Sequence, residues 1–192
     1  MMFHFFRRNP SNRSIASLYG MIVAQARATP FYRSYGVPDT VNGRFEMVVL
    51  HAVLVLHRLE SGPASVRSLG QGLFDRFCAD MDGSLREMGV GDLAVPDKMR
   101  KIGEAFYGRQ AAYAAALADS ELAPLAAALA RNVFGEQGGS EPGAIRLAGY
   151  VRAAAGQLAV QDAEALGRAE LHFPDPKGIT VTGETQARDA AP

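Results

Sequence analysis

The sequence is poor in the residues and motifs that usually mark secreted proteins and membrane spans. It has no tryptophan and a single cysteine, Cys78, so no internal disulfide can form and the chain suits a reducing compartment. The longest apolar stretch, residues 47–56, is interrupted by His51 and is much shorter than the roughly 20 residues that span a bilayer. Arg7 and Arg8 are followed by no hydrophobic segment with a cleavage site, so we expect no secretory signal and a cytoplasmic location.

An excess of charge of either sign is also missing. The chain has 20 basic and 20 acidic residues, which gives a formal net charge of +0. Lysine is scarce and occurs only at Lys98, Lys101 and Lys177, so arginine supplies most of the positive charge. Without a net positive field the chain has no general attraction for polyanions, and we expect no DNA partner.

The side chains that bind metals or carry out catalysis show no useful spacing. A helical di-iron site needs Glu-x-x-His motifs, whereas Glu46 and His51 are five residues apart and His51 and His57 are six apart. Neither spacing aligns a pair on one helical face. Cys78 neighbours Phe74 and Phe77 and is expected in the core. We therefore predict no metal, no cofactor and no catalytic residue.

Helical periodicity is the dominant positive signal. Apolar residues recur at intervals of three and four, and prolines and glycines separate the periodic segments. The pattern predicts an all-α, bundle-like single domain of about six helices. We expect a flexible segment at 1–13, a helical domain at 14–172 and an irregular tail at 173–192. The predicted helices cover residues 15–26, 45–59, 65–88, 96–117, 120–134 and 142–171.

The segment between the third and fourth predicted helices has a higher charge density than a helical hairpin needs. It reads DMDGSLREMGVGDLAVPDKMRKIGEAFYGR, residues 80–109. Gly89 is placed to end the helix in a left-handed conformation, with Leu85 and Val90 in the contacting positions of a Schellman motif. Glu87 in the last turn opposes the helix dipole, and Val95 is a poor N-cap. Both departures indicate a surface shaped for recognition.

A more ordinary interpretation of this corner stays open. Glu87 could pair with Arg86, Lys98 or Arg100, and such exposed ion pairs contribute only about 0–1 kcal/mol. A second charged segment lies near the start of the second predicted helix. There either Asp39 or Asn42 could cap the helix, and we expect His51 to be partly buried and hydrogen-bonded within the protein.

Three stretches together resemble the ubiquinol–cytochrome c chaperone family. They are residues 80–109, quoted above, VPDTVNGRFEMVVLH at residues 37–51 and LYGMIVAQARATPFY at residues 18–32. The resemblance covers roughly Leu18 to Leu117, about half of the chain. It implies a helical, non-catalytic protein that assists assembly of the cytochrome bc1 complex (complex III). Mitochondrial relatives bind newly made cytochrome b near the ribosome exit together with a small partner. The lack of a long presequence fits the shorter bacterial version.

We accordingly expect an assembly chaperone whose client is cytochrome b or its nascent chain, with the ribosome or a small assembly partner as further partners. The family motif alone suggests a binding role for Arg44 and Glu46. The charged corner supplies the remaining contacts, with exposed apolar residues rimmed by charge. The predicted partner-binding residues are Asp39, Arg44, Glu46, Asp82, Arg86, Glu87, Met88, Asp92 and Lys98.

The extreme N-terminus, MMFHFFRRNPSNR, is predicted to contact an anionic membrane. Aromatic side chains can enter the headgroup region while arginines meet anionic lipid. This would place the protein peripherally on the bacterial inner membrane. The alternative is that the aromatic side chains fold back onto the helices. The predicted membrane-contact residues are Phe3, Phe5, Phe6, Arg7 and Arg8.

Two other functions remain open from the sequence. One is a small enzyme acting on a lipid or quinone-like ligand, with the acid, arginine and histidine of residues 39–51 lining its pocket. The other is an adaptor at the membrane surface. A deep cavity containing those side chains would favour the enzyme.

Overall fold

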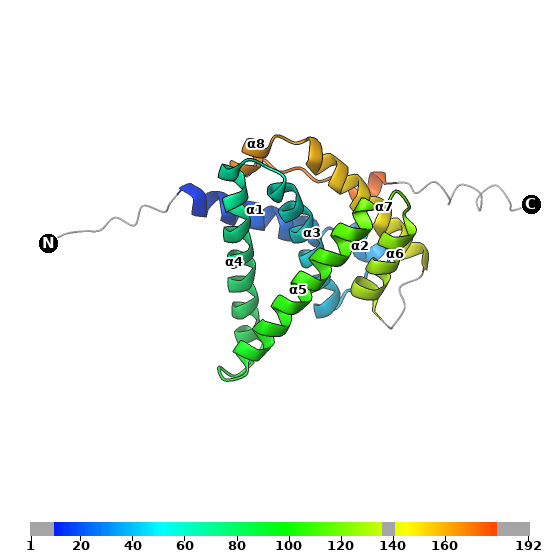
Figure 1. Ribbon diagram of the computed structural model, residues 1–192. Coiled ribbons are helices and arrows are strands. Elements are labelled where there is room, and N and C mark those ends of the chain that lie inside the picture. The colour runs from blue at the N-terminus through cyan, green and yellow to red at the C-terminus, as the bar shows by residue number, and fades with distance from the viewer. Residues whose placement is uncertain (1–9, 136–140, 180–192) are drawn as a thin grey trace, which may run out of the picture.

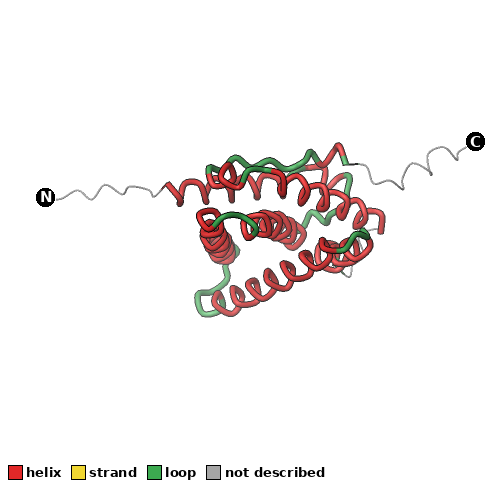
Figure 2. Tube along the Cα trace, turned by 45° about the horizontal axis from the view of Figure 1, so that its top comes forward, coloured by secondary structure: helices red, strands yellow, loops and turns green. Residues whose placement is uncertain are grey.

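The computed structural model describes residues 10–135 and 141–179, and all regular structure in those ranges is helical (Figure 2). The all-α fold predicted from the sequence is therefore confirmed. In chain order the elements are α1 Pro10–Ala26, α2 Thr29–Arg33, α3 Val41–Glu60, α4 Ala64–Glu87, α5 Val95–Ala118, α6 Ala123–Leu129, the π-helical turn η1 Ala130–Phe134, α7 Glu141–Val160, α8 Ala163–Gly167 and the 3-10 turn η2 Pro176–Gly178.

Helix α3 is the centre of the fold. Every residue from Met47 to Leu56 is buried, and α1, α4, α5 and α7 all pack against it. A helix that is apolar on all sides must be enclosed by other helices, which explains the longest apolar stretch of the sequence. No helix among the described residues combines the length and the apolar character needed to cross a bilayer.

Helices α4 and α5 form a V whose apex projects away from the other helices (Figure 1). Toward the open end of the V they flank α3. The aromatic rings of Phe74 and Phe77 on α4 pack against Phe106 on α5, with centroid distances of 5.0 Å. The apex is the loop of residues 88–94, and we call this loop together with the adjoining ends of α4 and α5, residues 82–98, the corner. The V thus presents the charged segment singled out in the sequence at one extremity of the described structure.

Most predicted helices lie where the periodicity placed them, but several boundaries differ. Helix α1 begins at Pro10 and not after Ser14, and α4 begins at Ala64 with Pro63 at its N-cap. The fifth predicted helix starts later, at Ala123, and ends in a π-helical turn before Gly135, whose φ is 63°.

The prediction that the last helix continues to residue 171 is wrong. Helix α7 ends at Val160, and Asp162 starts the separate helix α8 by accepting the backbone N–H groups of Glu164 and Ala165. An aspartate cap of this kind favours a new helix start over continuation. Residues 1–9 and 180–192 lie outside the described ranges, so the division at 1–13, 14–172 and 173–192 stays a prediction.

The segment after α8 returns across the helices that precede α3. Its backbone carbonyls accept hydrogen bonds from two earlier side chains: Gln25 bonds the carbonyl of Pro174 at 3.2 Å, and the Tyr35 hydroxyl bonds that of Pro176 at 2.6 Å. Phe173 lies edge-on to His51 with ring centroids 5.2 Å apart. The described part of the predicted tail is therefore packed against the domain.

Candidate functional site

The corner between α4 and α5 has the backbone that the sequence predicts. Gly89 has φ of 80°. The N–H of Val90 donates to the carbonyl of Leu85 at 3.0 Å, and that of Gly89 donates to Arg86 at 2.9 Å, which is the bond pair of a Schellman motif. Val95 is buried at the first position of α5. The start of α5 is therefore fixed by packing of an apolar side chain, and no side-chain cap is present there.

Arg86 is the electrostatic centre of the corner. It bonds Asp82 one turn earlier on α4 at 2.7 Å and also pairs with Asp92 in the loop. This arrangement differs from the alternative in which Glu87 takes Arg86, and Arg100 pairs instead with Glu104. Because all of these groups are exposed, the pairs contribute little to stability but define where charge stands on the surface.

Two other predicted partner-binding residues of the corner remain available. Glu87 and Lys98 are exposed and form no ion pair with another described residue. Asp92 is itself highly exposed despite its bond to Arg86. The corner thus offers charges of both signs to solvent.

The start of α3 is built differently from either capping alternative. The hydroxyl of Thr40 accepts the N–H of Gly43 at 3.1 Å, so Thr40 is the N-cap. Asp39 instead pairs with Arg44 at 2.6 Å on the surface. Gly43 is required here, since a Cβ at that position would lie 2.0 Å from the carbonyl oxygen of Pro38.

Glu46, which we expected to contact a partner, faces the interior. Its side chain is 2 % exposed, and both carboxylate oxygens accept bonds from Arg109 of α5, at 2.6 Å from Nε and 2.5 Å from Nη2. Burial raises the pKa of Glu46, and the two bonds to Arg109 oppose that shift. Glu46 therefore joins α3 to α5, and we leave it out of the proposed partner surface.

His51 is fully buried and engaged by the protein itself. Its Nδ1 lies 2.8 Å from the carbonyl oxygen of Met47, so Nδ1 carries the proton and Nε2 accepts the Tyr150 hydroxyl at 2.9 Å. The Tyr150 oxygen in turn accepts an amide N–H of Gln25 at 3.0 Å. Burial lowers the pKa of His51 to about 4. The hydrogen-bonded histidine expected from the sequence is confirmed, and it is more deeply buried than predicted.

An open groove connects the two charged segments, which are distant in sequence. It has a volume of about 580 Å³ and lies between α1, α3, α4 and α5. Arg44 from the start of α3 and Met88 from the corner both line it. Its apolar lining consists of Val23, Val41, Phe45, Val48, Met81, Leu85, Met88 and Ile102. We call this feature the groove.

The mouth of the groove carries apolar side chains that the fold does not cover. Val41 in the first turn of α3 is 70 % exposed, and Met88 is 58 % exposed. Leu93, at the tip of the corner, is 98 % exposed. Sequence reasoning missed Val41 and Leu93. Leu93 follows Gly91 and Asp92 in the short connection between the two helices, and an apolar residue in such a turn is a signal that could have revealed it. Val41 and Met88 thus extend the apolar lining of the groove to solvent, and Leu93, which is outside that lining, exposes a further apolar side chain on the corner.

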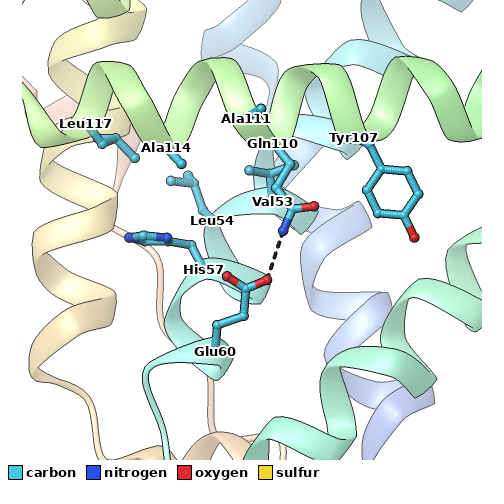
Figure 3. Close-up of a pocket in the computed structure, with 9 residues that line it drawn as sticks. All are labelled: Val53, Leu54, His57, Glu60, Tyr107, Gln110, Ala111, Ala114 and Leu117. Atoms are coloured by element: carbon cyan, nitrogen blue, oxygen red, sulfur yellow. Dashed lines mark hydrogen bonds between the residues drawn. The ribbon is translucent and has the colours of Figure 1, made fainter.

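A second hollow, of about 310 Å³, lies between α3 and α5 farther from the corner (Figure 3). Val53, Leu54 and Leu117 give it apolar walls. Figure 3 shows Gln110 reaching across to Glu60, with a hydrogen bond of 2.9 Å. None of the charged residues predicted to bind a partner lines this hollow.

The residues expected for an enzyme do not gather in a cavity. Asp39 and Arg44 are paired at the surface, whereas His51 is enclosed and bonded on both ring nitrogens. Within residues 10–135 and 141–179 there is no cluster of three or more histidine, cysteine or acidic side chains that could hold a metal ion. The predicted membrane-contact residues, Phe3, Phe5, Phe6, Arg7 and Arg8, lie outside the described residues.

Comparison with known proteins gives two matches relevant to this surface. The family model described as ubiquinol-cytochrome C chaperone matches residues 33–173. The crystal structure of the Cbp3 homolog from Brucella abortus is 38% identical in sequence and superposes with a TM-score of 0.82, covering 89% of this chain and 94% of that chain. No curated protein matches the chain.

Proposed function

We propose that this chain, which belongs to the ubiquinol–cytochrome c chaperone family, assists assembly of the cytochrome bc1 complex by binding cytochrome b or its nascent chain. The observation that supports this most directly is the open apolar groove beside a charged corner. Cytochrome b is a hydrophobic membrane subunit, and an unassembled apolar segment needs cover from water.

The groove is suited to transient cover of such a segment. Its apolar side chains are already held in place by four helices, so little backbone has to become ordered on binding. Met81 and Met88 supply flexible, polarisable side chains that can adapt to different apolar surfaces. The groove therefore supports binding to varied apolar sequences better than recognition of one rigid ligand.

The charged residues around the groove are proposed to orient the client. Asp82, Arg86 and Asp92 form one connected group, and Glu87 and Lys98 are free to pair with a partner. Charges at the edge of an interface mainly affect association rate and orientation. We propose that binding involves no bond-making step, and that the ribosome or a small assembly partner meets the same protein during synthesis of the client.

Affinity purification of the tagged full-length chain from its native host tests the client. We expect cytochrome b to be recovered with the wild-type protein and to be reduced several-fold by Val41→Asp, which places a charge at the groove mouth. Val41 is exposed and lies in the first helical turn, where an acidic residue suits the helix dipole. The control is Val160→Asp, at the exposed C-terminal end of α7, where the helix dipole disfavours aspartate, so a general effect on stability would be at least as large as at Val41.

Equal recovery of cytochrome b with both variants would remove the groove from the proposal. Absence of cytochrome b from every purification would contradict the client assignment itself. Reversal of charge at Arg86 and Glu87 together tests the corner, for which we expect lower complex III levels in cells. Unchanged complex III would show that the corner is not the contact.

The location follows as a separate part of the proposal. We propose a cytoplasmic protein that binds anionic membrane peripherally through its N-terminal residues. Flotation of the purified protein with anionic vesicles, with and without residues 2–8, tests this directly. Vesicle binding without any recovery of cytochrome b would favour the adaptor function over the chaperone function.

A further inference from the structure

The length of the groove limits what it can hold. Along α4 and its C-cap the lining runs from Asp80 to Met88, eight steps that rise about 12 Å at 1.5 Å per residue. On the facing side the lining includes Val23 of α1 and Arg27, the residue directly after α1, four positions later. A helix that spans the hydrocarbon core is about 30 Å long. The groove is therefore as long as two helical turns and covers less than half of such a helix.

The volume of the groove leads to the same size of occupant. A cavity of about 150 Å³ takes one benzene-sized group, so a groove of about 580 Å³ takes three to four large side chains. An amphipathic helix presents four anchors at positions i, i+3, i+4 and i+7, which extend over about 10 Å. Length and volume thus agree on two turns of one helix.

The charges at the edge of the groove specify the polar side of that helix. Arg27 is exposed and forms no ion pair with a described residue. Arg44 pairs with Asp39 on the surface and its guanidinium lies 5.8 Å from the centroid of the Tyr32 ring; the exposed ion pair is a weak interaction that a ligand carboxylate can replace. Asp80 is engaged by the Tyr19 hydroxyl at 2.8 Å. Asp80 keeps its negative charge in this bond, but Arg27 is the charged lining side chain that has neither an ion pair nor a hydrogen bond to another described residue, and its charge is positive.

We propose that the groove binds two turns of a single amphipathic helix of the client, with a carboxylate beside the apolar anchors that faces Arg27 and Arg44. The proposal rests on the proposed function and narrows it to a class of client segment. It excludes a fully apolar membrane helix bound along its whole length. It also gives the bound helix a preferred rotation, because only one flank of the groove carries the arginines.

Fluorescence anisotropy with designed peptides tests the inference on the full-length protein. The probes are fluorescein-labelled, stapled helical peptides of 14 residues with leucine at i, i+3, i+4 and i+7, and with Glu, Gln or Lys at one flanking position. We expect the Glu peptide to bind up to about fivefold more tightly than the Lys peptide. Salt should reduce this preference, since the charges are exposed.

Variants and a longer peptide make the test selective. Arg27→Gln should reduce the Glu preference, and Arg27→Gln combined with Arg44→Gln should abolish it. Val41→Asp should weaken binding of all three peptides, while Val160→Asp should not. A 21-residue peptide with the same apolar face continued should bind within about twofold of the shorter one, since the groove has no further length to offer.

Three results would overturn the inference: no binding of any peptide, equal or tighter binding of the Lys peptide, or a tenfold gain on lengthening. These outcomes are separable from failure of the proposed function. If cytochrome b is recovered from cells but the peptides do not show the Glu preference, only the helix assignment fails. If the peptides behave as expected but cytochrome b is never recovered, the groove is correctly described and the client is another protein.

Discussion

Replacement of Arg109 by methionine tests how the fold holds α5 against α3 near the groove. Arg109 bonds both oxygens of Glu46, and Glu46 has no other described hydrogen-bond partner for its carboxylate. Arg109→Met keeps most of the length and apolar contact of the side chain but removes the charge. The buried carboxylate is then left without a counter-ion.

The expected cost follows from the burial of the two groups. Losing one partner of a buried ion pair destabilises a protein by about 3–5 kcal/mol, because the remaining charge is stranded. The Glu46 side chain is 2 % exposed, but Arg109 is 21 % exposed, so water can partly replace the guanidinium. We therefore expect Arg109→Met to lower the free energy of unfolding by about 3 kcal/mol at pH 7.

The double variant Glu46→Met/Arg109→Met provides the matched control. Replacing a buried ion pair with apolar groups of similar volume is often nearly neutral, so we expect most of the lost stability to return. The coupling free energy from the double-mutant cycle should then be at least about 2 kcal/mol. Urea unfolding followed by circular dichroism measures all four proteins.

The pH dependence of the stability of Arg109→Met distinguishes two causes of a loss in stability: an unpaired buried charge on Glu46, and the loss of packing around residue 109. Without the two bonds, burial alone acts on Glu46 and raises its pKa further in the folded state. A carboxyl group whose folded pKa is raised favours folding at low pH, and that contribution is lost as pH rises through the folded pKa. The variant should therefore approach wild-type stability between pH 7 and pH 5. A loss below about 1 kcal/mol, or a loss independent of pH, would refute the reasoning.

Two further predictions concern His51 and the glycines. The pKa of His51 is lowered to about 4 in the folded protein from its usual value near 6.5. Neutral His51 therefore contributes to the free energy of unfolding above pH 6.5, and about 3 kcal/mol of this contribution is lost as pH falls toward 4. Unfolding of His51→Asn should show a smaller decrease over this range than wild type or the exposed control His57→Gln, and parallel curves would contradict the assignment. Gly43→Ala should lower the melting temperature, because the added Cβ would clash with the Pro38 carbonyl oxygen. Gly20→Ala, in open space on α1, should raise the melting temperature, because alanine favours the helix more than glycine does. Equal shifts of the melting temperature in the two variants would refute this.

The features that sequence reasoning predicted well are local ones. The Schellman ending at Gly89 depends on residues within five positions of one another, and the order of apolar residues fixes most helices regardless of what they pack against. The missed boundary between α7 and α8 was also local. Asp162 followed by Ala-Glu-Ala is a helix-start signal, but the continuing apolar period concealed it.

The placement of Glu46 could not be predicted from local patterns, because its partner is 63 residues away. The position of Glu46 in the helical repeat nevertheless indicated that its side chain is buried. Glu46 lies four positions before Leu50 and three after Gly43, on the buried side of α3. A charged residue at such a position requires an opposite charge from another helix. The sequence indicates that a cation must be supplied, but only the fold identifies Arg109.

The groove itself is a consequence of tertiary structure. Its lining comes from four helices, and each contributes residues at a different point along the chain. Periodicity assigns Phe45, Met81 and Ile102 to apolar faces, and the expected result would be complete burial. Toward the corner α4 and α5 project away from the other helices (Figure 1), and Phe45, Met81 and Ile102 are only partly buried. This incomplete cover cannot be derived from the pattern of any single helix.

The small size of the groove has a consequence for the chaperone function. Two turns of helix bury far less surface than the roughly 1,600 Å² of a standard stable interface, so the complex would be weak and would dissociate quickly. An assembly chaperone must release its client to the next subunit, and a tight complex would prevent that transfer. If the proposed client binds there, the exposed charges of the corner would accelerate encounter without adding much affinity, and the arrangement would combine rapid capture with rapid release. A binding surface with a larger apolar area would improve capture only at the expense of assembly.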